Sequence, residues 1–166
     1  AKLLDLLVVI SFISEDIWQV LLGGSEELGV FAHGYTYSGH PVGAATALAN
    51  LDILERESLV ENAAKVGAHM QSALRERLLK HPNVGEIRGE GLIAAVQLVE
   101  SKDPKTFYEA PNKPAVPVAA AAMNHGVIIR PLPTGDSLAI SPPLIITEKE
   151  VDFLVSAIEK SLADVY

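Results

Sequence analysis

The stretch FAHGYTYSGHPVGAA, residues 31–45, places many hydrogen-bonding side chains directly before an alanine-rich segment. Thr36 and Ser38 supply hydroxyls that can donate to phosphate oxygens, and Tyr35 and Tyr37 can flank a flat ring. The start of a helix carries unpaired N–H groups and a partial positive charge, so it binds anions readily. The stretch is therefore a candidate phosphate site. A capped helix start whose polar side chains are satisfied locally explains the same residues, and this alternative stays open.

Other patterns in the chain say less about chemistry. His33 and His40 lie seven residues apart, and Glu26 and Glu27 are the nearest candidate partners, so structural histidines are the better interpretation than a metal site. The motif GEG at residues 89–91 is too short for a dinucleotide fingerprint, and the chain shows no P-loop, zinc pattern or Ser-His-Asp spacing. We predict no metal.

A second candidate is Arg130, which ends an apolar segment just before the Pro- and Gly-containing sequence LPTGD. A guanidinium at this place can bind a substrate carboxylate through two parallel hydrogen bonds. A salt bridge to the nearby Asp136 competes with this role, and the sequence alone favours the salt bridge. Arg88, between Ile87 and Gly89, is expected to pair structurally with a carboxylate.

Composition limits the kind of partner. The 166 residues carry 13 Lys and Arg against 21 Asp and Glu, a net charge of −8. This argues against nucleic acid as the main partner, because phosphate binding needs a basic stripe and none is present. The chain has no cysteine, so we expect a cytoplasmic protein. The apolar run Leu3–Ile13 is interrupted by Asp5 and is too short to cross a bilayer, so a buried strand or helix is expected there and no membrane partner.

Apolar periodicity predicts helices over residues 42–57, 115–125 and the two segments that begin with capping boxes, Ser58 with Glu61 and Thr147 with Glu150. Residues 84–99 and the short sequences VIIRP and SLAIS are expected to be extended, and residues 100–114 to form a loop. This order predicts an α+β domain, a mostly antiparallel sheet with helices on one face.

Several motifs together resemble the class III pyridoxal-phosphate-dependent aminotransferases, the group that contains ω-amino acid:pyruvate transaminases. They are HGYTYSGHP followed by ALANLDILERE, then VGEIRGEGLIAAVQLV, and finally GVIIRPLPTGDSLAISPPLIITEKEVD. The resemblance runs from about Ser14 to the C-terminus, in the family's order. It implies a fold-type I enzyme in which residues 1–41 are a remnant of the large cofactor domain, and residues 42–166 form a linking helix and the small C-terminal domain.

The resemblance also implies roles for individual residues. Thr36 resembles the threonine that reaches across a homodimer to the phosphate of the partner's pyridoxal 5'-phosphate, with Tyr35 and Ser38 also at the cofactor. Arg130 resembles the mobile arginine that pairs with a substrate carboxylate and swings away for an uncharged amine, and Tyr37 is expected at the substrate.

Lys2 is the candidate for the lysine that bonds covalently to the cofactor. The sequence LLDLLVVISF after it departs from the family pattern. Either foreign or frame-shifted sequence has replaced the true segment, or Lys2 is that lysine in an altered context. The acidic residue that pairs with the cofactor ring nitrogen, and the phosphate loop of the same subunit, are expected before Ala1. The chain is therefore interpreted as a truncated C-terminal portion with little or no activity alone.

The function implied is amino-group transfer from an ω-amino acid or amine to a keto acid such as pyruvate. Two alternatives remain. One is a non-catalytic domain that keeps the small-domain fold and serves dimerisation or partner binding. The other is a pyridoxal-phosphate-dependent aminomutase or decarboxylase, because related folds support several reactions.

Overall fold

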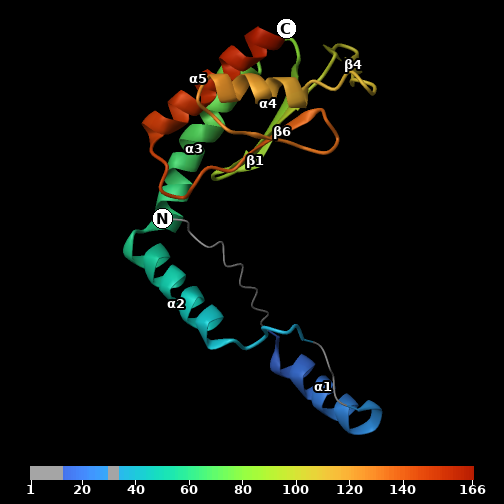
Figure 1. Cartoon of the computed structure of the whole chain (residues 1–166), viewed down its shortest axis with the longest axis vertical. Helices are drawn as coiled ribbons and strands as arrows, with labels where there is room; N and C mark the ends of the chain where they lie inside the picture. Colours follow the sequence, from blue (N-terminus) through green and yellow to red (C-terminus); the bar gives the residue numbers. More distant parts are fainter. Residues whose placement is uncertain (1–12, 30–33) are drawn as a thin grey trace. The chain divides into compact units, whose positions relative to one another are not determined.

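Two units make up the chain, one over residues 1–56 and the other over residues 57–166. The computed structural model describes residues 13–29 and 34–166 (Figure 1). Lys2, His33 and all of the run Leu3–Ile13 except its last residue lie outside the described residues. The division into a cofactor-domain remnant and a small domain at residue 41 stays a prediction.

The first unit contains two helices, α1 (Glu15–Leu28) and α2 (Pro41–Arg56). The sequence analysis did not anticipate α1, which begins at an N-cap serine: the Ser14 hydroxyl accepts from the backbone N–H of Ile17 at 3.4 Å. α2 begins at Pro41, one residue before the predicted start; a proline suits the first helical position because it has no N–H to leave unsatisfied. Neither helix buries a residue in the described part of the chain.

The second unit is an antiparallel sheet with three helices, which confirms the predicted α+β class. The helices are α3 (Leu59–Leu78), α4 (Ala115–Asn124) and α5 (Glu148–Val165). The strands are β1 (Val84–Glu90), β2 (Ile93–Leu98), β5 (Arg130–Pro131) and β6 (Ser137–Ile140), in the order β1-β2-β6-β5. A separate small hairpin, β3 (Ser101–Lys102) and β4 (Lys105–Thr106), lies within the segment expected to be a loop.

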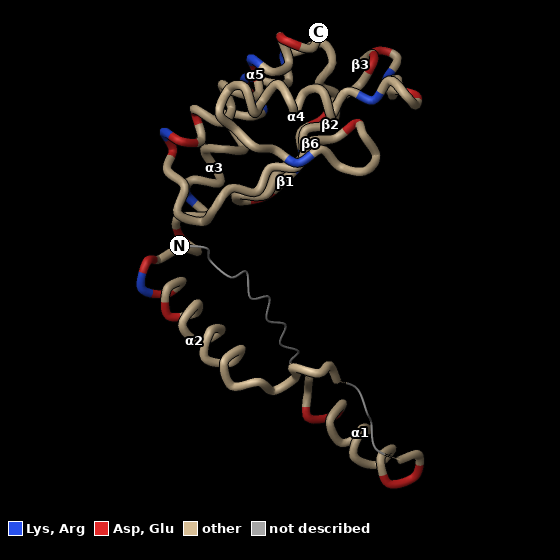
Figure 2. Tube along the Cα trace, viewed as in Figure 1, with Lys and Arg blue, Asp and Glu red and all other residues tan. Residues whose placement is uncertain are grey.

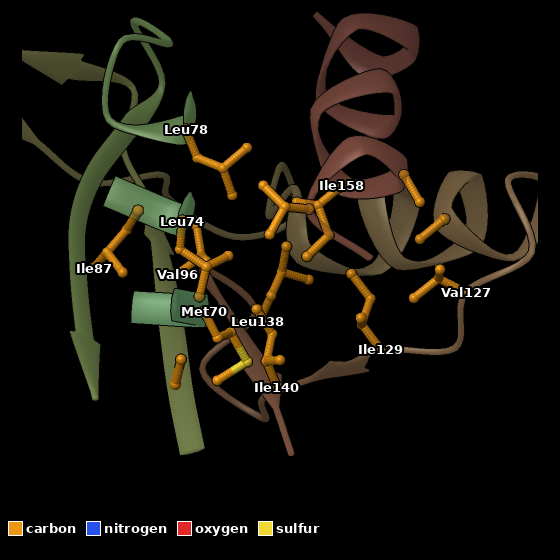
Figure 3. Packing of buried hydrophobic residues seen from close by; sticks show 14 of the residues in the cluster. Met70, Leu74, Leu78, Ile87, Val96, Val127, Ile129, Leu138, Ile140 and Ile158 are labelled. Atoms are coloured by element: carbon orange, nitrogen blue, oxygen red, sulfur yellow. The ribbon is translucent and has the colours of Figure 1, made fainter. Parts of the chain in front are cut away.

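The core of the second unit forms where the helices cover one face of the sheet (Figure 3). Alternate residues of β2, namely Ala94, Val96 and Leu98, are buried there, while Ala95 and Gln97 between them are half-buried. The predicted apolar faces of α3 and α5 are confirmed. Their buried members are Leu59, Val66, Met70, Leu74 and Leu78 in α3, and Val151, Val155, Ile158 and Leu162 in α5.

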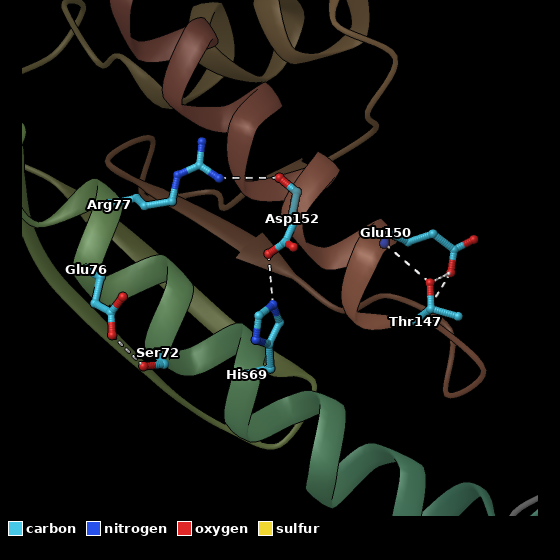
Figure 4. Close-up of polar contacts among 7 residues, drawn as sticks. All are labelled: His69, Ser72, Glu76, Arg77, Thr147, Glu150 and Asp152. Carbon is cyan, nitrogen blue, oxygen red and sulfur yellow. Dashed lines mark hydrogen bonds and ion pairs between the residues drawn. The ribbon is translucent and has the colours of Figure 1, made fainter.

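One of the two predicted capping boxes is wrong. Ser58 lies in the left-handed region (φ 49°, ψ 45°), and its side chain makes no capping hydrogen bond. An N-cap residue needs an extended backbone, and the connection of only Glu57 and Ser58 between α2 and α3 does not give Ser58 that conformation. The box at Thr147 and Glu150 is confirmed (Figure 4). The backbone N–H of Glu150 donates to Thr147 Oγ1 at 3.3 Å, and that of Thr147 donates to Glu150 Oε2 at 2.8 Å.

The predicted strand VIIRP is shorter than expected, because only Arg130 and Pro131 pair with β6. The residues before them complete the end of α4: the backbone N–H of Val127 donates to the carbonyl of Ala122, and Gly126 adopts φ 82°. A left-handed glycine commonly ends a helix in this way. Ile129 still enters the core and is buried, which places the next side chain, Arg130, on the other face of the sheet.

Polar contacts hold α5 against the neighbouring helices. His69 of α3 meets Asp152 at 2.8 Å, and His125, which follows α4, meets Asp164 at 2.6 Å (Figure 4 shows the first). Both pairs are partly exposed, so each adds little to stability by itself. They fix the position of α5 over a core that is already apolar.

A close approach between α3 and the β1–β2 turn sets the geometry of the sheet edge. A Cβ built on Gly67 lies 2.4 Å from the carbonyl carbon of Gly91, so only glycine fits. The Gln71 side chain donates to the carbonyls of Gly91 and Ile93, at 3.1 Å each. One turn of α3 therefore holds the hairpin by contact and by two hydrogen bonds.

We expect Gly67→Ala to lower the stability of the second unit by about 1–3 kcal/mol, because the added methyl group forces the backbone of the hairpin away from α3. Urea unfolding followed by circular dichroism measures the change. Gly24→Ala is the matched control, since a Cβ there meets nothing within 4 Å. An equal effect of the two substitutions would show that the contact does not limit packing.

The capping box predicts a pH dependence. The hydrogen bonds from the hydroxyl and the backbone of Thr147 lower the pKa of Glu150. A lowered folded-state pKa stabilises the fold above the ordinary pKa of the carboxyl, and this contribution disappears as the pH falls through the lowered value. We expect Glu150→Gln to destabilise the protein at pH 7 and to have a smaller effect near pH 3. Thermal melts of both proteins across this range measure the difference, and a constant difference would contradict the assignment.

Candidate functional site

The turn before α2 closes on itself through its own hydrogen bonds. The backbone N–H of Ser38 donates to the carbonyl of Tyr35 at 2.9 Å, and the backbone N–H of Tyr35 donates to Ser38 Oγ at 2.8 Å. The backbone N–H of His40 donates to the carbonyl of Tyr37 at 3.1 Å. Gly39 has φ 73°, a left-handed conformation that glycine adopts without strain. This short sequence therefore forms a defined turn.

Within this turn, Thr36 is the residue whose side chain stays available. It is exposed, and its hydroxyl makes no hydrogen bond to another described residue. The Ser38 hydroxyl accepts from Tyr35, but its own proton can still be donated. Tyr35 and Tyr37 expose 80% and 78% of their surface, so both rings can flank a ligand. The arrangement supplies hydroxyl donors at a helix start, which suits a phosphate group.

His40 caps the helix that follows the turn. Its carbonyl accepts from the backbone N–H of Ala44 at 3.2 Å, and its Nδ1 accepts from the backbone N–H of Val42 at 3.2 Å. His40 was predicted to be a structural histidine, and in the structure its side chain accepts a hydrogen bond from the start of α2. Within residues 13–29 and 34–166, no group of three or more metal-binding side chains could hold a metal ion.

The second candidate region is the uncovered face of the sheet in the second unit. Arg130 pairs with Ala139, Ala139 with Ala95, and Ala95 with Arg88, so these four side chains lie in one row on the same face. Arg88 pairs with Glu86 at 3.7 Å, as predicted. Arg130 is exposed and forms no ion pair with another described residue.

The salt bridge expected between Arg130 and Asp136 is wrong. Asp136 Oδ1 instead accepts hydrogen bonds from Thr134 Oγ1 at 2.8 Å and Ser137 Oγ at 3.0 Å. Burial alone raises the pKa of Asp136, but these two hydrogen bonds and nearby Lys113 outweigh it and lower the pKa. The carboxylate is thus satisfied within its own turn, and the Arg130 guanidinium is left for another partner.

Arg130 also lines a groove of about 670 Å³ at the β5 edge of the sheet. The volume lies in the range of about 300–1,000 Å³ that is usual for small-molecule sites. Most of the lining is apolar, as with Ile140, Pro142 and Phe153. Glu150 is the acidic residue of the lining, and its carboxylate already serves the capping box. The arginine is therefore the charged group of this groove that can still bind an anion.

The family model for class-III aminotransferases matches residues 9–162. The chain belongs to the class III aminotransferase family. The match spans both units, and it includes the turn before α2 as well as the strand that carries Arg130. Of the described helices, none is long and apolar enough to cross a bilayer.

Individual relatives agree with this membership. The chain is 43% identical over 155 residues to an uncharacterised aminotransferase of Sinorhizobium fredii, covering 93% of this chain and 33% of that protein. It is 39% identical over 152 residues to the putrescine–pyruvate aminotransferase of Pseudomonas aeruginosa, covering 90% and 31%. The chain thus spans about a third of the length of the relatives it matches.

Among solved structures, the ω-transaminase of Pseudomonas jessenii in complex with PMP superimposes with a TM-score of 0.83 at 44% identity. The superposition covers 92% of this chain and 33% of that one. The class III family uses pyridoxal phosphate, and the free hydroxyl and helix start of the turn fit the phosphate end of this cofactor. Among the described residues, no lysine lies in this turn, and Lys2 is outside them.

The structure groups four of the predicted site residues, Tyr35, Thr36, Tyr37 and Ser38, in the one turn. Arg130 belongs to the other unit. The sequence did not reveal that His40 caps α2, or that the Ser38 hydroxyl stabilises the turn by accepting a hydrogen bond from the Tyr35 amide. The spacing Ser-Gly-His-Pro held a clue to the cap, because a proline at the first helical position places the cap one residue before it.

We expect Ser38→Ala to speed hydrogen exchange at the Tyr35 amide about fivefold, because the loss of one hydrogen bond costs about 1 kcal/mol. Amide exchange measured by NMR tests this. Thr36→Val is the control and should leave the exchange rate unchanged, since the Thr36 hydroxyl does not bond to the turn. Equal acceleration of Tyr35 amide exchange by both variants would mean that the Ser38 hydroxyl does not protect this amide specifically.

Proposed function

We propose that this chain contributes to a pyridoxal-phosphate-dependent transaminase that moves an amino group from an ω-amino acid or amine to a keto acid such as pyruvate. One observation carries the proposal: a chain of this family presents, in the turn before α2, an exposed threonine hydroxyl that makes no hydrogen bond to another described residue. Family membership supports the reaction, and the Pseudomonas aeruginosa relative, named for putrescine and pyruvate, supports these substrate classes.

The turn holds the phosphate of the cofactor in this proposal. Thr36 donates its hydroxyl proton, Ser38 can add a second, and Gly39 leaves open space in which the phosphate can approach the backbone. The partial positive charge at the α2 start favours the doubly charged ester. When bound, pyridoxal phosphate supplies an aldehyde that takes up the amino group and a ring that accepts electrons from the substrate carbon.

We further propose that the phosphate belongs to a cofactor held mainly by a second copy of the protein. α2 carries no charged residue before Asp52, as the tan stretch in Figure 2 shows, and Val42, Leu48 and Leu51 are exposed on it. An apolar helix without a buried residue needs a partner surface. A homodimer that shares the site supplies that surface and places Tyr35 beside the cofactor.

Arg130 recognises the substrate carboxylate in this proposal, with Tyr37 also at the substrate. Two observations support Arg130: its guanidinium lacks an ion-pair partner among the described residues, and it borders a mostly apolar groove. A planar guanidinium binds a carboxylate through two parallel hydrogen bonds, and a long flexible side chain can turn away when the substrate has no carboxylate.

The first test concerns Thr36. In the holoenzyme, Thr36→Val should speed the dissociation of pyridoxal phosphate about tenfold, because a hydrogen bond to a charged oxygen is lost. The release is followed by the absorbance of the cofactor. Thr46→Val is the matched control: its hydroxyl already donates to the carbonyl of Val42 at 2.8 Å within the same helix. Unchanged dissociation in the Thr36 variant would contradict the proposed site.

The second test concerns Arg130. Arg130→Ala should raise the KM for an amino donor that carries a carboxylate by about tenfold or more. It should leave the KM for an amine donor without a carboxylate nearly unchanged. Arg88→Ala is the control, since this arginine lies in the same row of the sheet and is paired with Glu86. Equal effects on both donors would show that Arg130 does not recognise the carboxylate.

A further inference from the structure

We propose that His40 is a positioning residue for the phosphate site, and that it acts as a neutral imidazole which caps α2 through Nδ1. The proposal rests on the proposed function, because it concerns how the turn that presents Thr36 is held. It adds a residue whose ring has a defined tautomer.

The hydrogen bonds identify His40 as the N-cap. An N-cap residue has a carbonyl that accepts the first helical bond and a side chain that accepts from the second or third amide of the helix. The carbonyl of His40 accepts from Ala44, and its Nδ1 accepts from Val42, the second helical residue. Pro41 has no N–H, so the amide of Val42 is the first donor that the helix start has to satisfy.

The cap requires one particular form of the ring. A neutral imidazole has one nitrogen that donates and one that accepts, and a protonated imidazole has two donors. Since Nδ1 accepts from Val42, the proton must reside on Nε2. The neighbouring Tyr37 ring packs against the imidazole in a T-shaped arrangement: the two centroids are 5.8 Å apart and the planes are inclined by 70°.

The same residue joins the helix to the turn. The backbone N–H of His40 donates to the carbonyl of Tyr37, and Tyr37 lies between Thr36 and Ser38. One residue thus fixes the first amide of α2 on one side and the turn on the other. Movement of the ring displaces the helix start relative to the Thr36 hydroxyl, and both are needed to hold a phosphate.

The direct experiment is 15N NMR of the histidine rings in the protein at pH 8. We expect the Nε2–H tautomer for His40, with a Nδ1 shift typical of a hydrogen-bonded acceptor. We also expect Val42 amide exchange to be slow and to accelerate about fivefold in His40→Ala. A proton on Nδ1, or a Val42 amide whose exchange is indifferent to the substitution, would overturn the proposal.

Cofactor retention by the holoenzyme gives the second readout. His40→Ala should release pyridoxal phosphate about fivefold faster, and His40→Asn should restore slow release because an asparagine oxygen caps well. Release from His40→Asn as fast as from His40→Ala would overturn the proposal, because a side-chain acceptor at the cap would then make no difference to cofactor retention.

The two proposals fail in different ways. If Thr36→Val speeds release and His40→Ala does not, the phosphate site stands and the capping role is wrong. If neither substitution changes release while the tautomer and the Val42 amide are as expected, His40 caps the helix and the phosphate site is wrong.

Discussion

Hydrogen bonds between its own groups hold the turn at Tyr35–Ser38, and everything inferred about this site depends on that constraint. Ser38 Oγ and the local carbonyls accept from the amides of Tyr35, Ser38 and His40, and the Thr36 hydroxyl makes no hydrogen bond to another described residue. His40 then satisfies the first amide of α2. An exposed polar group that makes no hydrogen bond to the rest of the protein can bind a ligand without a loss of folding stability. The helix start beside it favours an anion.

In the second unit, the candidate binding group is Arg130, and local contacts again determine which side chains remain available. Its core is complete: three helices cover one face of the sheet, and the contact of Gly67 with Gly91 fixes the hairpin edge. The side chains on the other face of the sheet are not needed for this core, so they can serve different purposes. Along one row of the sheet Arg88 forms an ion pair with Glu86, whereas Arg130 has no ion-pair partner among the described residues, because Asp136 is held by its own turn. This difference supports the proposal that Arg130, rather than Arg88, binds a substrate carboxylate.

Much of this fold follows from the sequence, since strong periodicity defines α3 and α5 and a clear cap defines Thr147. The errors have local physical causes. Ser58 matched a capping motif but sits in a two-residue connection whose backbone is left-handed. Asp136 lies near Arg130 in sequence, yet hydroxyls of Thr134 and Ser137 reach it first. α1 was missed although Ser14, Glu15 and Asp16 form an ordinary helix start. The capping nitrogen of His40 was not predictable, because it depends on ring orientation.

The central claim is that the amides and the hydroxyl around Thr36 meet the phosphate of the cofactor. A 1H–15N NMR titration of the labelled protein with pyridoxal phosphate tests it most directly. The account predicts that the largest shifts fall on Thr36, Gly39 and the first turn of α2, and that inorganic phosphate competes for the same amides. Binding of the cofactor that leaves these amides unchanged and shifts residues elsewhere would contradict it.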